Sequence, residues 1–330
     1  MHPAVRADGT WSCCISGPRL RPGSRGVVGL PALHVDLPYR PPIAWDRLVA
    51  FIGARAARGV EYVTDGRYAR TVRIGKYTGV IRVAPPARDS ATGGVAETVS
   101  LEASASLEPV LTPLIARVRH LFDLDADTNV IEAHLTATES IRVGDDTRGL
   151  RVPGAYDGFE LAVRAIVGQQ VTVKGASTLM TRLAIAFGEA IHIDDALLTH
   201  VTPEPRHIAG ASVAEIRAIG VPAARAASLL ALATACARGE LTIEPTSDVP
   251  ELMRKLRAVP GIGPWTAEYV AMRATHWSDA FPVGDLALRR AAGNVSAAEL
   301  LRTSEQWRPW RAYAAMHLWA GLSQPAKAGG

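Results

Sequence analysis

Residues 256–273, with the sequence LRAVPGIGPWTAEYVAMR, decide the fold of the second half of the chain. A helical pattern runs into Pro260, and the glycines after it, Gly261 and Gly263, allow a tight turn in backbone conformations closed to other residues. A new helix is predicted from Trp265. Such a helix-hairpin-helix leaves backbone N–H groups unpaired at the positive end of the second helix, where a phosphate group can bind. The segment therefore indicates contact with a nucleic-acid backbone, which does not read base sequence.

The meaning of this hairpin depends on the residues that come after it, because an isolated Pro-Gly-X-Gly turn more often simply joins two helices. Residues 281–284, Phe-Pro-Val-Gly, lead to Asp285 and then to an amphipathic stretch. An aspartate in this place is ordinarily the N-cap of a helix. A carboxylate in a Gly/Pro-rich loop can also serve catalysis, and the two roles are compatible.

Outward from this segment, the residue pattern divides the chain into three regions. Residues 1–35 mix Pro, Gly, Ser and Arg without a period and are predicted to form an unstructured tail. Residues 36–120 are predicted to form an α+β N-terminal domain, with a helix over 45–58 and antiparallel strands over 61–74, 78–83 and 97–107. Residues 121–330 are predicted to be all-α, with the hairpin at 250–275 and the loop of Asp285 at 281–286. Helical patterns cover 111–122, 158–187, 213–219, 222–238, 250–259, 265–275 and 304–322.

The charge, the cysteines and the apolar runs of the chain limit its partners and its compartment. The formal net charge is +4, but much of the excess lies in the first 35 residues, whereas basic residues outnumber acidic ones nine to five over residues 254–311. The three cysteines match neither a disulfide framework nor a metal-binding spacing, which favours a reducing compartment, here the cytoplasm of a bacterium with its nucleoid. The apolar run at 226–237 is too short to cross a membrane, and the N-terminus does not resemble a signal peptide.

Four ordered blocks resemble the helix-hairpin-helix-Gly/Pro/Asp DNA glycosylase superfamily, and within it the DNA-3-methyladenine glycosylase II (AlkA) type. They are LPYRPP at 37–42, RVPG at 151–154 continued by RAIVGQQ at 164–170, the hairpin with its aspartate, and WRPWRAY at 307–313. The resemblance extends over residues 37–323. It implies a monofunctional glycosylase that flips alkylated bases, 3-methyladenine and related alkylpurines, out of double-stranded DNA and hydrolyses the N-glycosidic bond in base excision repair. It also implies a monomer.

By this resemblance Asp285 is the catalytic residue. A fixed anion suits the reaction because cleavage passes through an oxocarbenium-like state, and an alkylated purine that already carries positive charge leaves easily. Trp265 stands where members with lyase activity have a lysine, so no AP lyase activity is expected. Leu286 departs from the aromatic residue that the family has after the aspartate. The residues implied to line an aromatic cleft that attracts cationic bases are Trp265, Tyr269, Trp319 and Phe51.

The resemblance implies further contacts with DNA. Gln170 would fill the gap that the flipped base leaves in the duplex, with Gln169 beside it. The other implied DNA-binding residues are Gly261, Gly263 and Thr266. Superfamily hairpins often hold a monovalent cation, Na⁺ or K⁺, here through the backbone carbonyls of Arg257, Val259 and Ile262. No cofactor is required, and the four cysteines of an iron-sulfur cluster are missing.

Two other functions remain open at this point. A glycosylase for oxidised purines is one, although its usual form has a lysine where this chain has Trp265. A non-catalytic DNA-binding module of an alkylation-response protein is the other, although residues 1–35 show no helix-turn-helix and such a module has no need of Asp285. An assay for release of bases from methylated DNA, with the freed bases analysed by chromatography, would discriminate best among these functions.

Overall fold

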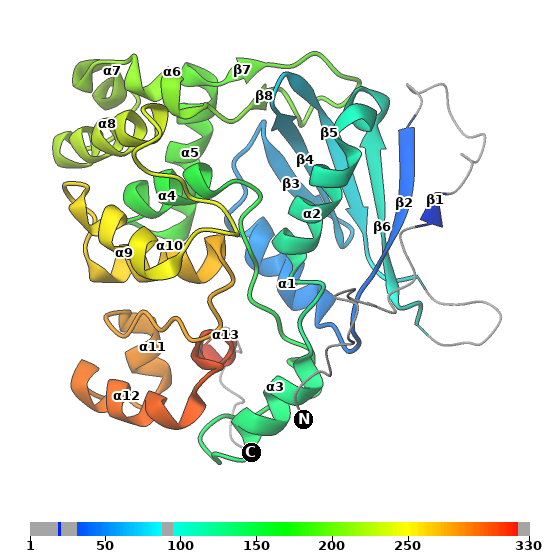
Figure 1. Cartoon of the computed structure of the whole chain (residues 1–330), viewed down its shortest axis with the longest axis vertical. Helices are drawn as coiled ribbons and strands as arrows, with labels where there is room; N and C mark the ends of the chain where they lie inside the picture. Colours follow the sequence, from blue (N-terminus) through cyan, green and yellow to red (C-terminus); the bar gives the residue numbers. More distant parts are fainter. Residues whose placement is uncertain (1–18, 21–31, 88–94, 323–330) are drawn as a thin grey trace, which may run out of the picture.

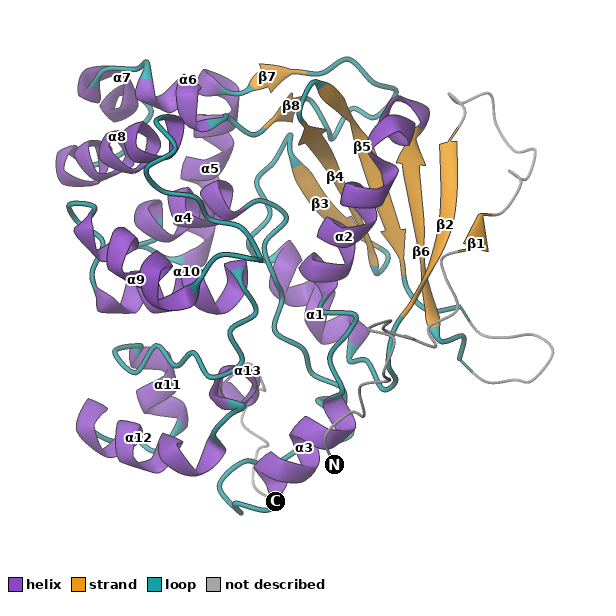
Figure 2. Ribbon diagram, viewed as in Figure 1, coloured by secondary structure: helices purple, strands orange, loops and turns teal. Residues whose placement is uncertain are grey.

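The computed structural model describes residues 19–20, 32–87 and 95–322, and these form a sheet domain followed by helices (Figures 1 and 2). The α+β N-terminal domain and the helical region predicted from the sequence are confirmed. The strands are β1 (Arg19–Leu20), β2 (Ala32–Pro38), β3 (Glu61–Thr64), β4 (Arg67–Ile74), β5 (Tyr77–Ala84), β6 (Thr98–Ser104), β7 (Glu189–Ala190) and β8 (His200–Val201). The helices of the sheet domain are α1 (Trp45–Gly53), α2 (Leu111–Phe122) and the 3-10 turn η1 (Ala105–Val110).

The remaining helices form two groups. The larger group contains α4 (Gly158–Val167), α5 (Val173–Phe187), α6 (Pro205–Ala209), α7 (Val213–Ala218), α8 (Ala223–Ala237), α9 (Val249–Ala258) and α10 (Pro264–Ala274). The smaller group contains α3 (Thr128–Thr136), α11 (Leu286–Ala291), α12 (Ala297–Ser304), the 3-10 turn η2 (Glu305–Trp307) and α13 (Arg311–Leu322). Each group has its own apolar core, and Trp319 on α13 packs against both cores. None of the helices in the described part of the chain is long and apolar enough to cross a membrane.

The sheet is antiparallel, with the strand order β1-β2-β6-β5-β4-β3. Burial alternates along β6, as expected of a strand with one face on a core, and α1 and α2 cover that face (Figure 2). The middle of β4 is buried on both faces. Part of its second face is covered by the segment around Leu198, which packs with Ala69 and Val80.

The structure differs from the sequence-based expectations at several places. The helix predicted over 304–322 is divided, because the 3-10 turn η2 lies between α12 and α13. The stretch 61–74 is two strands, because Asp65 and Gly66 both adopt positive φ (48° and 69°) and form a hairpin turn. The stretch 158–187 is two helices, separated at residues 168–172. The region after residue 121 is not all-helical, since β7 and β8 pair within it. The predicted tail lies mostly outside the described residues, but β1 and the start of β2 fall within it.

Arg151 joins two of the sequence blocks. Its side chain is 1% exposed, and its guanidinium donates hydrogen bonds to the backbone carbonyls of Arg40, Pro42, Asp123 and Ala126. The four carbonyl acceptors of its two terminal nitrogens offset the cost of burying the guanidinium charge. The blocks at 37–42 and 151–154 therefore hold the sheet domain against the start of the helical region.

Candidate active site around Asp285

Asp285 occupies the N-cap of α11. The turn before it is closed by the Asp285 N–H, which donates to the carbonyl of Pro282 over 2.8 Å. Its Oδ1 accepts the backbone N–H of Leu288 at 2.9 Å, so the predicted N-cap is confirmed. The positive end of the helix faces the carboxylate and favours its negative charge.

Two tryptophans, one before Asp285 in the sequence and one after it, donate hydrogen bonds to its carboxylate. The indole Nε1 of Trp265, at the start of α10, donates to Oδ2 over 3.2 Å, and that of Trp319, on α13, donates to Oδ1 over 3.3 Å. All three side chains are half-buried. Because both oxygens accept hydrogen bonds, the carboxylate is fixed in one orientation at the junction of the two helical groups.

The wall beside Trp265 is aromatic. The ring of Trp265 stacks on that of Tyr269, with centroids 5.4 Å apart and planes 9° from parallel. The Tyr269 hydroxyl accepts a hydrogen bond of 2.8 Å from Arg273, whose other donors bind the carbonyls of Pro153 and Gly154. Positions 265, 269 and 273 are spaced by four, so they lie along one face of α10.

Two arginines, Arg55 and Arg273, contact the ring of Phe51 and connect it with this aromatic wall. The guanidinium carbon of Arg55 is 3.5 Å from the Phe51 ring centroid, and that of Arg273 is 5.2 Å away. Burial raises the pKa of Tyr269, but the positive charges of Arg273 and Arg55 outweigh it and lower the pKa below its ordinary value. The two arginines were not among the predicted site residues; for Arg273, the four-residue spacing from Tyr269 was the available signal.

The two glycines of the hairpin differ from one another. Gly261 has φ 84°, and a Cβ there would lie 2.1 Å from the Oγ of Ser228, so only glycine fits. Gly263 has φ −84° and ψ 177°, which any residue can adopt, so the prediction of a restricted conformation is wrong for it. A Cβ at Gly263 would meet nothing within 4 Å. Gly263 has no side chain to cap α10, which leaves the first N–H groups of that helix to other acceptors.

Gln169 and Thr266 contact one another. The side-chain amide of Gln169 donates to the Thr266 hydroxyl over 3.2 Å and to the carbonyl of Gly261 over 3.0 Å. Thr266 is only 3% exposed. Gln170, in contrast, is exposed and stands at φ 55° in the turn between α4 and α5. Of the three predicted DNA-binding side chains Gln169, Gln170 and Thr266, only that of Gln170 is exposed to solvent.

The carbonyls named for a monovalent cation lie around the hairpin. The carbonyl of Arg257 is in the last turn of α9, where a helix leaves carbonyls without intrahelical partners. The carbonyl of Val259 accepts the N–H of Ile262 at 3.1 Å and keeps a second lone pair. Among the described residues, no group of three or more His, Cys, Asp or Glu side chains could hold a metal ion.

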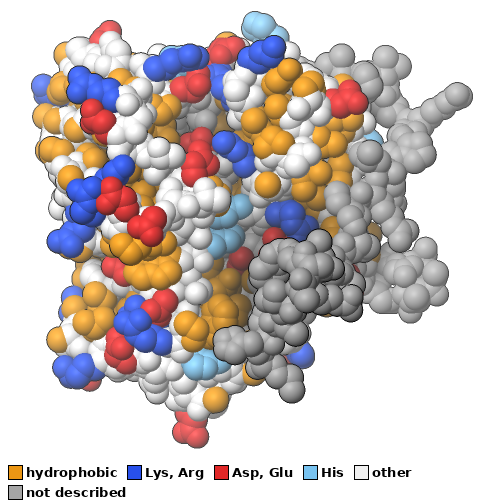
Figure 3. Space-filling view, viewed as in Figure 1, with side chains coloured by type: hydrophobic (Ala, Val, Ile, Leu, Met, Phe, Trp, Pro, Cys, Tyr) orange, Lys and Arg blue, Asp and Glu red, His pale blue; other side chains and the backbone are white. Residues whose placement is uncertain are grey.

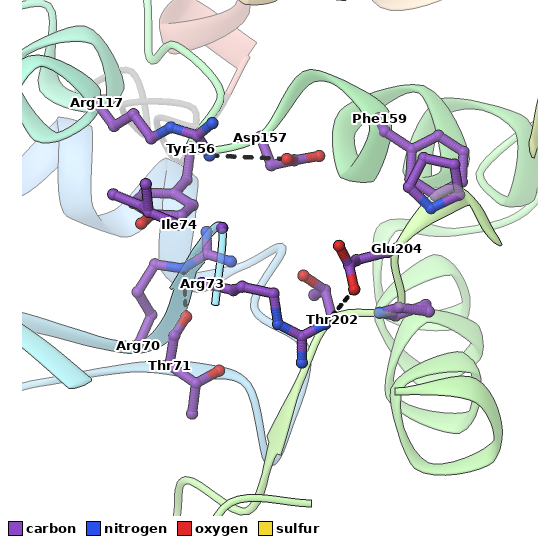
Figure 4. A pocket seen from close by; sticks show the side chains of 13 residues that line it. Arg70, Thr71, Arg73, Ile74, Arg117, Tyr156, Asp157, Phe159, Thr202 and Glu204 are labelled. Atoms are coloured by element: carbon purple, nitrogen blue, oxygen red, sulfur yellow. Dashed lines mark hydrogen bonds and ion pairs between the residues drawn. The ribbon is translucent and has the colours of Figure 1, made fainter. Parts of the chain in front are cut away.

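A separate cavity of about 170 Å³ lies between the sheet and the helical region (Figure 4). Its arginines already have acidic partners: Arg73 bonds to Glu204 at 2.7 Å, and Arg117 lies 3.8 Å from Asp157. Arg70, fully buried, bonds to Glu160 at 2.7 Å. Because these charges balance one another, the cavity belongs to an ion-paired seam between domains, and it contains none of the residues around Asp285.

The surface charges do not form a single basic face on the side that Figure 3 shows, where basic and acidic side chains are interspersed. Several arginines of the 254–311 stretch are engaged inside the fold. Arg308 and Arg311 both pair with Asp279, and Arg273 is buried. The excess of basic residues in that stretch is therefore weaker support for an anionic partner than the count suggests.

Comparison with known proteins defines the class. Residues 34–157 match the family model of the AlkA N-terminal domain, and residues 163–308 match that of the HhH-GPD superfamily base excision DNA repair proteins. The chain is thus a helix-hairpin-helix protein of base excision repair. It is 37% identical over 283 residues to DNA-3-methyladenine glycosylase 2 of Escherichia coli, covering 86% of this chain and 95% of that protein. It therefore belongs to the AlkA family of DNA-3-methyladenine glycosylases.

Other relatives agree with this family. The chain is 37% identical over 307 residues to a probable bifunctional transcriptional activator/DNA repair enzyme AlkA of Mycobacterium tuberculosis; the match covers 92% of this chain but 58% of the length of that protein. The fold is shared with 3-methyladenine DNA-glycosylase from Archaeoglobus fulgidus (TM-score 0.69, 18% identity, 87% of this chain and 96% of that one). It is also shared with the 8-oxoguanine glycosylase/lyase of Clostridium acetobutylicum (TM-score 0.66, 16% identity, 92% and 96%).

Proposed function

We propose that this protein is a monofunctional DNA glycosylase that excises alkylated bases such as 3-methyladenine from double-stranded DNA. The observation that carries the proposal is the Asp285 carboxylate, held by the indole N–H groups of Trp265 and Trp319 at the junction of two helical groups. The close relation to the enzyme of Escherichia coli that is named for this activity supports it.

Asp285 supplies the negative charge that the reaction needs. When the bond between C1′ and the base nitrogen breaks, the electron pair leaves with the base and C1′ becomes positively charged. A carboxylate whose orientation is already fixed stabilises that charge without reorganisation, and water then adds to C1′. The hydrogen bonds at 2.9 to 3.3 Å from Leu288, Trp265 and Trp319 provide this fixed orientation.

Trp265 and Trp319 give the base site its chemistry. A base that carries positive charge is attracted by the faces of electron-rich indole rings. Trp265 is further held in place by its stacking on Tyr269. At Phe51, the guanidinium of Arg55 already covers one face of the ring, 3.5 Å from its centroid, so that face is closed to the base. Leu286, 62% exposed beside Asp285, offers a smaller apolar surface than an aromatic residue would.

The hairpin is the proposed contact with the DNA backbone. Gly263 lies at the N-terminus of α10 with open space where a side chain would project, so a phosphate oxygen can approach the backbone N–H groups closely. This contact would be independent of base sequence. When bound, a Na⁺ or K⁺ ion held by the carbonyls of Arg257, Val259 and Ile262 would add positive charge at the same place.

The absence of lyase activity is part of the proposal. Lyase chemistry needs an amine close to C1′, and Trp265 occupies the place of that amine. Lys255 lies on α9 with its ammonium 3.6 Å from the Glu251 carboxylate. Lys174 is exposed in the first turn of α5. A monomeric state and a location in the bacterial cytoplasm stay predictions.

The direct test is release of bases from methylated duplex DNA, with the freed bases separated by chromatography. We expect 3-methyladenine among the products and an intact DNA strand. A second duplex that contains 8-oxoguanine is assayed in parallel, and release of that base with no release from methylated DNA would favour a glycosylase for oxidised purines. Tight DNA binding without release of any base would favour a non-catalytic binding module.

A further inference from the structure

The turn at residues 168–172 is held in a conformation that its sequence alone does not favour. It follows α4 and precedes α5, and Gln170 stands in it at φ 55° with an exposed side chain. Residues other than glycine adopt this left-handed conformation only where the surroundings impose it. Within the turn, the Val171 N–H donates to the Gly168 carbonyl over a long 3.4 Å, so a contact from outside the turn would add to its support.

The neighbouring side chain provides that support. The Nε2 of Gln169 donates to the carbonyl of Gly261 at 3.0 Å and to the Oγ1 of Thr266 at 3.2 Å. A carbonyl can only accept, so the amide nitrogen, and not its oxygen, faces the hairpin. One side chain thus connects the turn with both the hairpin and the first turn of α10, which are 92 and 97 residues away in sequence.

The two acceptors are themselves fixed. Gly261 packs closely against Ser228 on α8, since a Cβ added to it would lie 2.1 Å from the Ser228 Oγ, and Thr266 is buried. The bridge therefore ties an exposed, strained turn to a rigid element. An amide engaged in this way is not offered to DNA, in contrast to that of Gln170.

We infer that Gln169 is a positioning residue that holds Gln170 at a fixed place relative to the hairpin. When the hairpin binds the phosphates, Gln170 is then already placed to fill the gap in the duplex. The inference rests on the proposed function, and on the role that the family resemblance implies for Gln170, which is to enter the gap left by the flipped base. It assigns Gln169 no contact with substrate. Loss of the bridge should leave the hairpin able to bind DNA but let Gln170 move.

The test compares substitutions that keep side-chain size. Gln169→Met removes both donors, and Thr266→Val removes one acceptor. Gln306→Met is the matched control, since Gln306 is exposed and bonds only to the Ser140 hydroxyl at 3.3 Å in the smaller helical group. Gln170→Ala removes the side chain that is being positioned.

The first measurement uses protein without DNA. Hydrogen-deuterium exchange of residues 168–172 should rise about tenfold in Gln169→Met and less in Thr266→Val, with no change there in Gln306→Met. Unchanged exchange in Gln169→Met would overturn the inference, whatever the enzyme does with DNA. The exchange measurement tests the inference even if the wild-type protein releases no base. Absence of base release would refute the proposed function and not the bridge made by Gln169.

The second measurement uses duplex DNA with 2-aminopurine beside an alkylated base. Gln169→Met should keep its affinity for undamaged duplex within about twofold, while the fluorescence rise on flipping and the single-turnover release rate fall about tenfold. The double variant Gln169→Met/Gln170→Ala should be no slower than Gln170→Ala alone, because both changes remove one function. Additive losses, or a loss of affinity equal to the loss of rate, would show that Gln169 contacts DNA itself and would overturn the inference.

Discussion

Trp319 donates its indole N–H to Oδ1 of Asp285 over 3.3 Å, although 34 residues separate the two in the sequence. The same oxygen accepts the Leu288 N–H, and the other oxygen accepts the indole of Trp265. Helices α10, α11 and α13 therefore meet at one carboxylate. The site exists only when both helical groups are packed together, and its geometry can be tested one hydrogen bond at a time.

Replacing Asp285 by Asn should abolish base release while DNA binding survives. The amide oxygen can still cap α11, but the negative charge is lost and the amide nitrogen meets an indole donor. Loss of transition-state stabilisation should slow release about a hundredfold or more. Single-turnover release from methylated DNA and fluorescence polarisation on undamaged duplex measure the two effects. Near wild-type release by this variant would remove Asp285 from the catalytic role.

Replacing Trp319 by Phe should keep the apolar packing of α13 and lose the hydrogen bond to Asp285. A hydrogen bond to a charged group contributes about 1.5 to 3 kcal/mol, so release should slow roughly tenfold or more. Trp265→Phe is the matched variant, since it removes the donor to the other carboxylate oxygen. If both variants released 3-methyladenine at the wild-type rate, the two indoles would not be needed to orient the carboxylate.

The parts of the site that the sequence predicted depend on local physics. Gly261 is required by its own φ, and Asp285 caps the helix that begins one residue later. The missed parts depend on packing between distant segments. Nothing near Gln169 in sequence indicates that Thr266, 97 residues away, accepts its hydrogen bond. Likewise, the family resemblance implies that Phe51 lines the cleft, but the two arginines that lie against its ring are placed there by tertiary contacts.

In the fold, too, the features set by the local sequence were predicted, and those set by contacts between distant segments were not. Helix α2 matches its predicted bounds because the apolar period is regular from Leu111 to Phe122. The break after α4 was missed because residues 168–172 contain no proline and only one glycine, and the turn is set by contact with the hairpin. The strand pair β7 and β8 was missed because each strand is two residues long, too short for a period to show.

Substitutions at Gly263 should separate DNA binding from stability. Asp or Asn there can cap α10, so neither should lower the melting temperature. Both fill the open space at the helix N-terminus, and Asp also repels phosphate, so affinity for undamaged duplex should fall about tenfold for Asn and further for Asp. Polarisation titrations at two salt concentrations measure this. Unchanged affinity in both folded variants would place the DNA backbone elsewhere.

Gly261→Ala should instead destabilise the protein. The new Cβ would meet Ser228 Oγ at 2.1 Å in a backbone conformation with φ 84°, so the free energy of unfolding should fall by about 2 kcal/mol. Ser228→Ala added to it should recover part of the loss by removing the hydroxyl. Urea unfolding of the single and double variants is the measurement, and equal stability of Gly261→Ala and wild type would contradict the steric argument.

Three histidines should each destabilise the protein on acidification between about pH 6.5 and pH 4. Burial lowers the pKa of His120 to about 3 and those of His276 and His317 to about 4. Below the ordinary pKa of histidine, the unfolded chain binds protons that the folded chain does not bind. The free energy of unfolding therefore decreases as the pH is lowered. Asp123 opposes this, because burial raises its pKa to about 7 and the folded protein holds that proton. Burial also raises the pKa values of Glu132, Asp157, Glu244 and Glu268, which act in the same direction as Asp123, so the contribution of a single histidine is measured by substitution.

His317→Leu tests this pH dependence. His317 is buried on α13, and neither ring nitrogen has a hydrogen-bond partner within the described part of the chain. Between pH 7.5 and pH 5.0 the variant should lose on the order of 2 kcal/mol less unfolding free energy than the wild type. Asp123→Asn should have the opposite effect and steepen the loss. Equal slopes in urea unfolding for the wild type and His317→Leu would show that His317 does not carry the effect.

The last prediction is that the protein releases bases without forming a covalent adduct with DNA. A lyase needs a neutral amine next to C1′. By the family resemblance Trp265 stands in that place, while Lys255 is paired with Glu251 and Lys174 is exposed on α5. Borohydride added to protein and methylated duplex should therefore trap nothing on a denaturing gel, while the Clostridium acetobutylicum glycosylase/lyase with its own substrate serves as the positive control. An enzyme-dependent adduct that disappears in Lys255→Ala or Lys174→Ala would overturn the monofunctional mechanism while leaving the glycosylase activity in place.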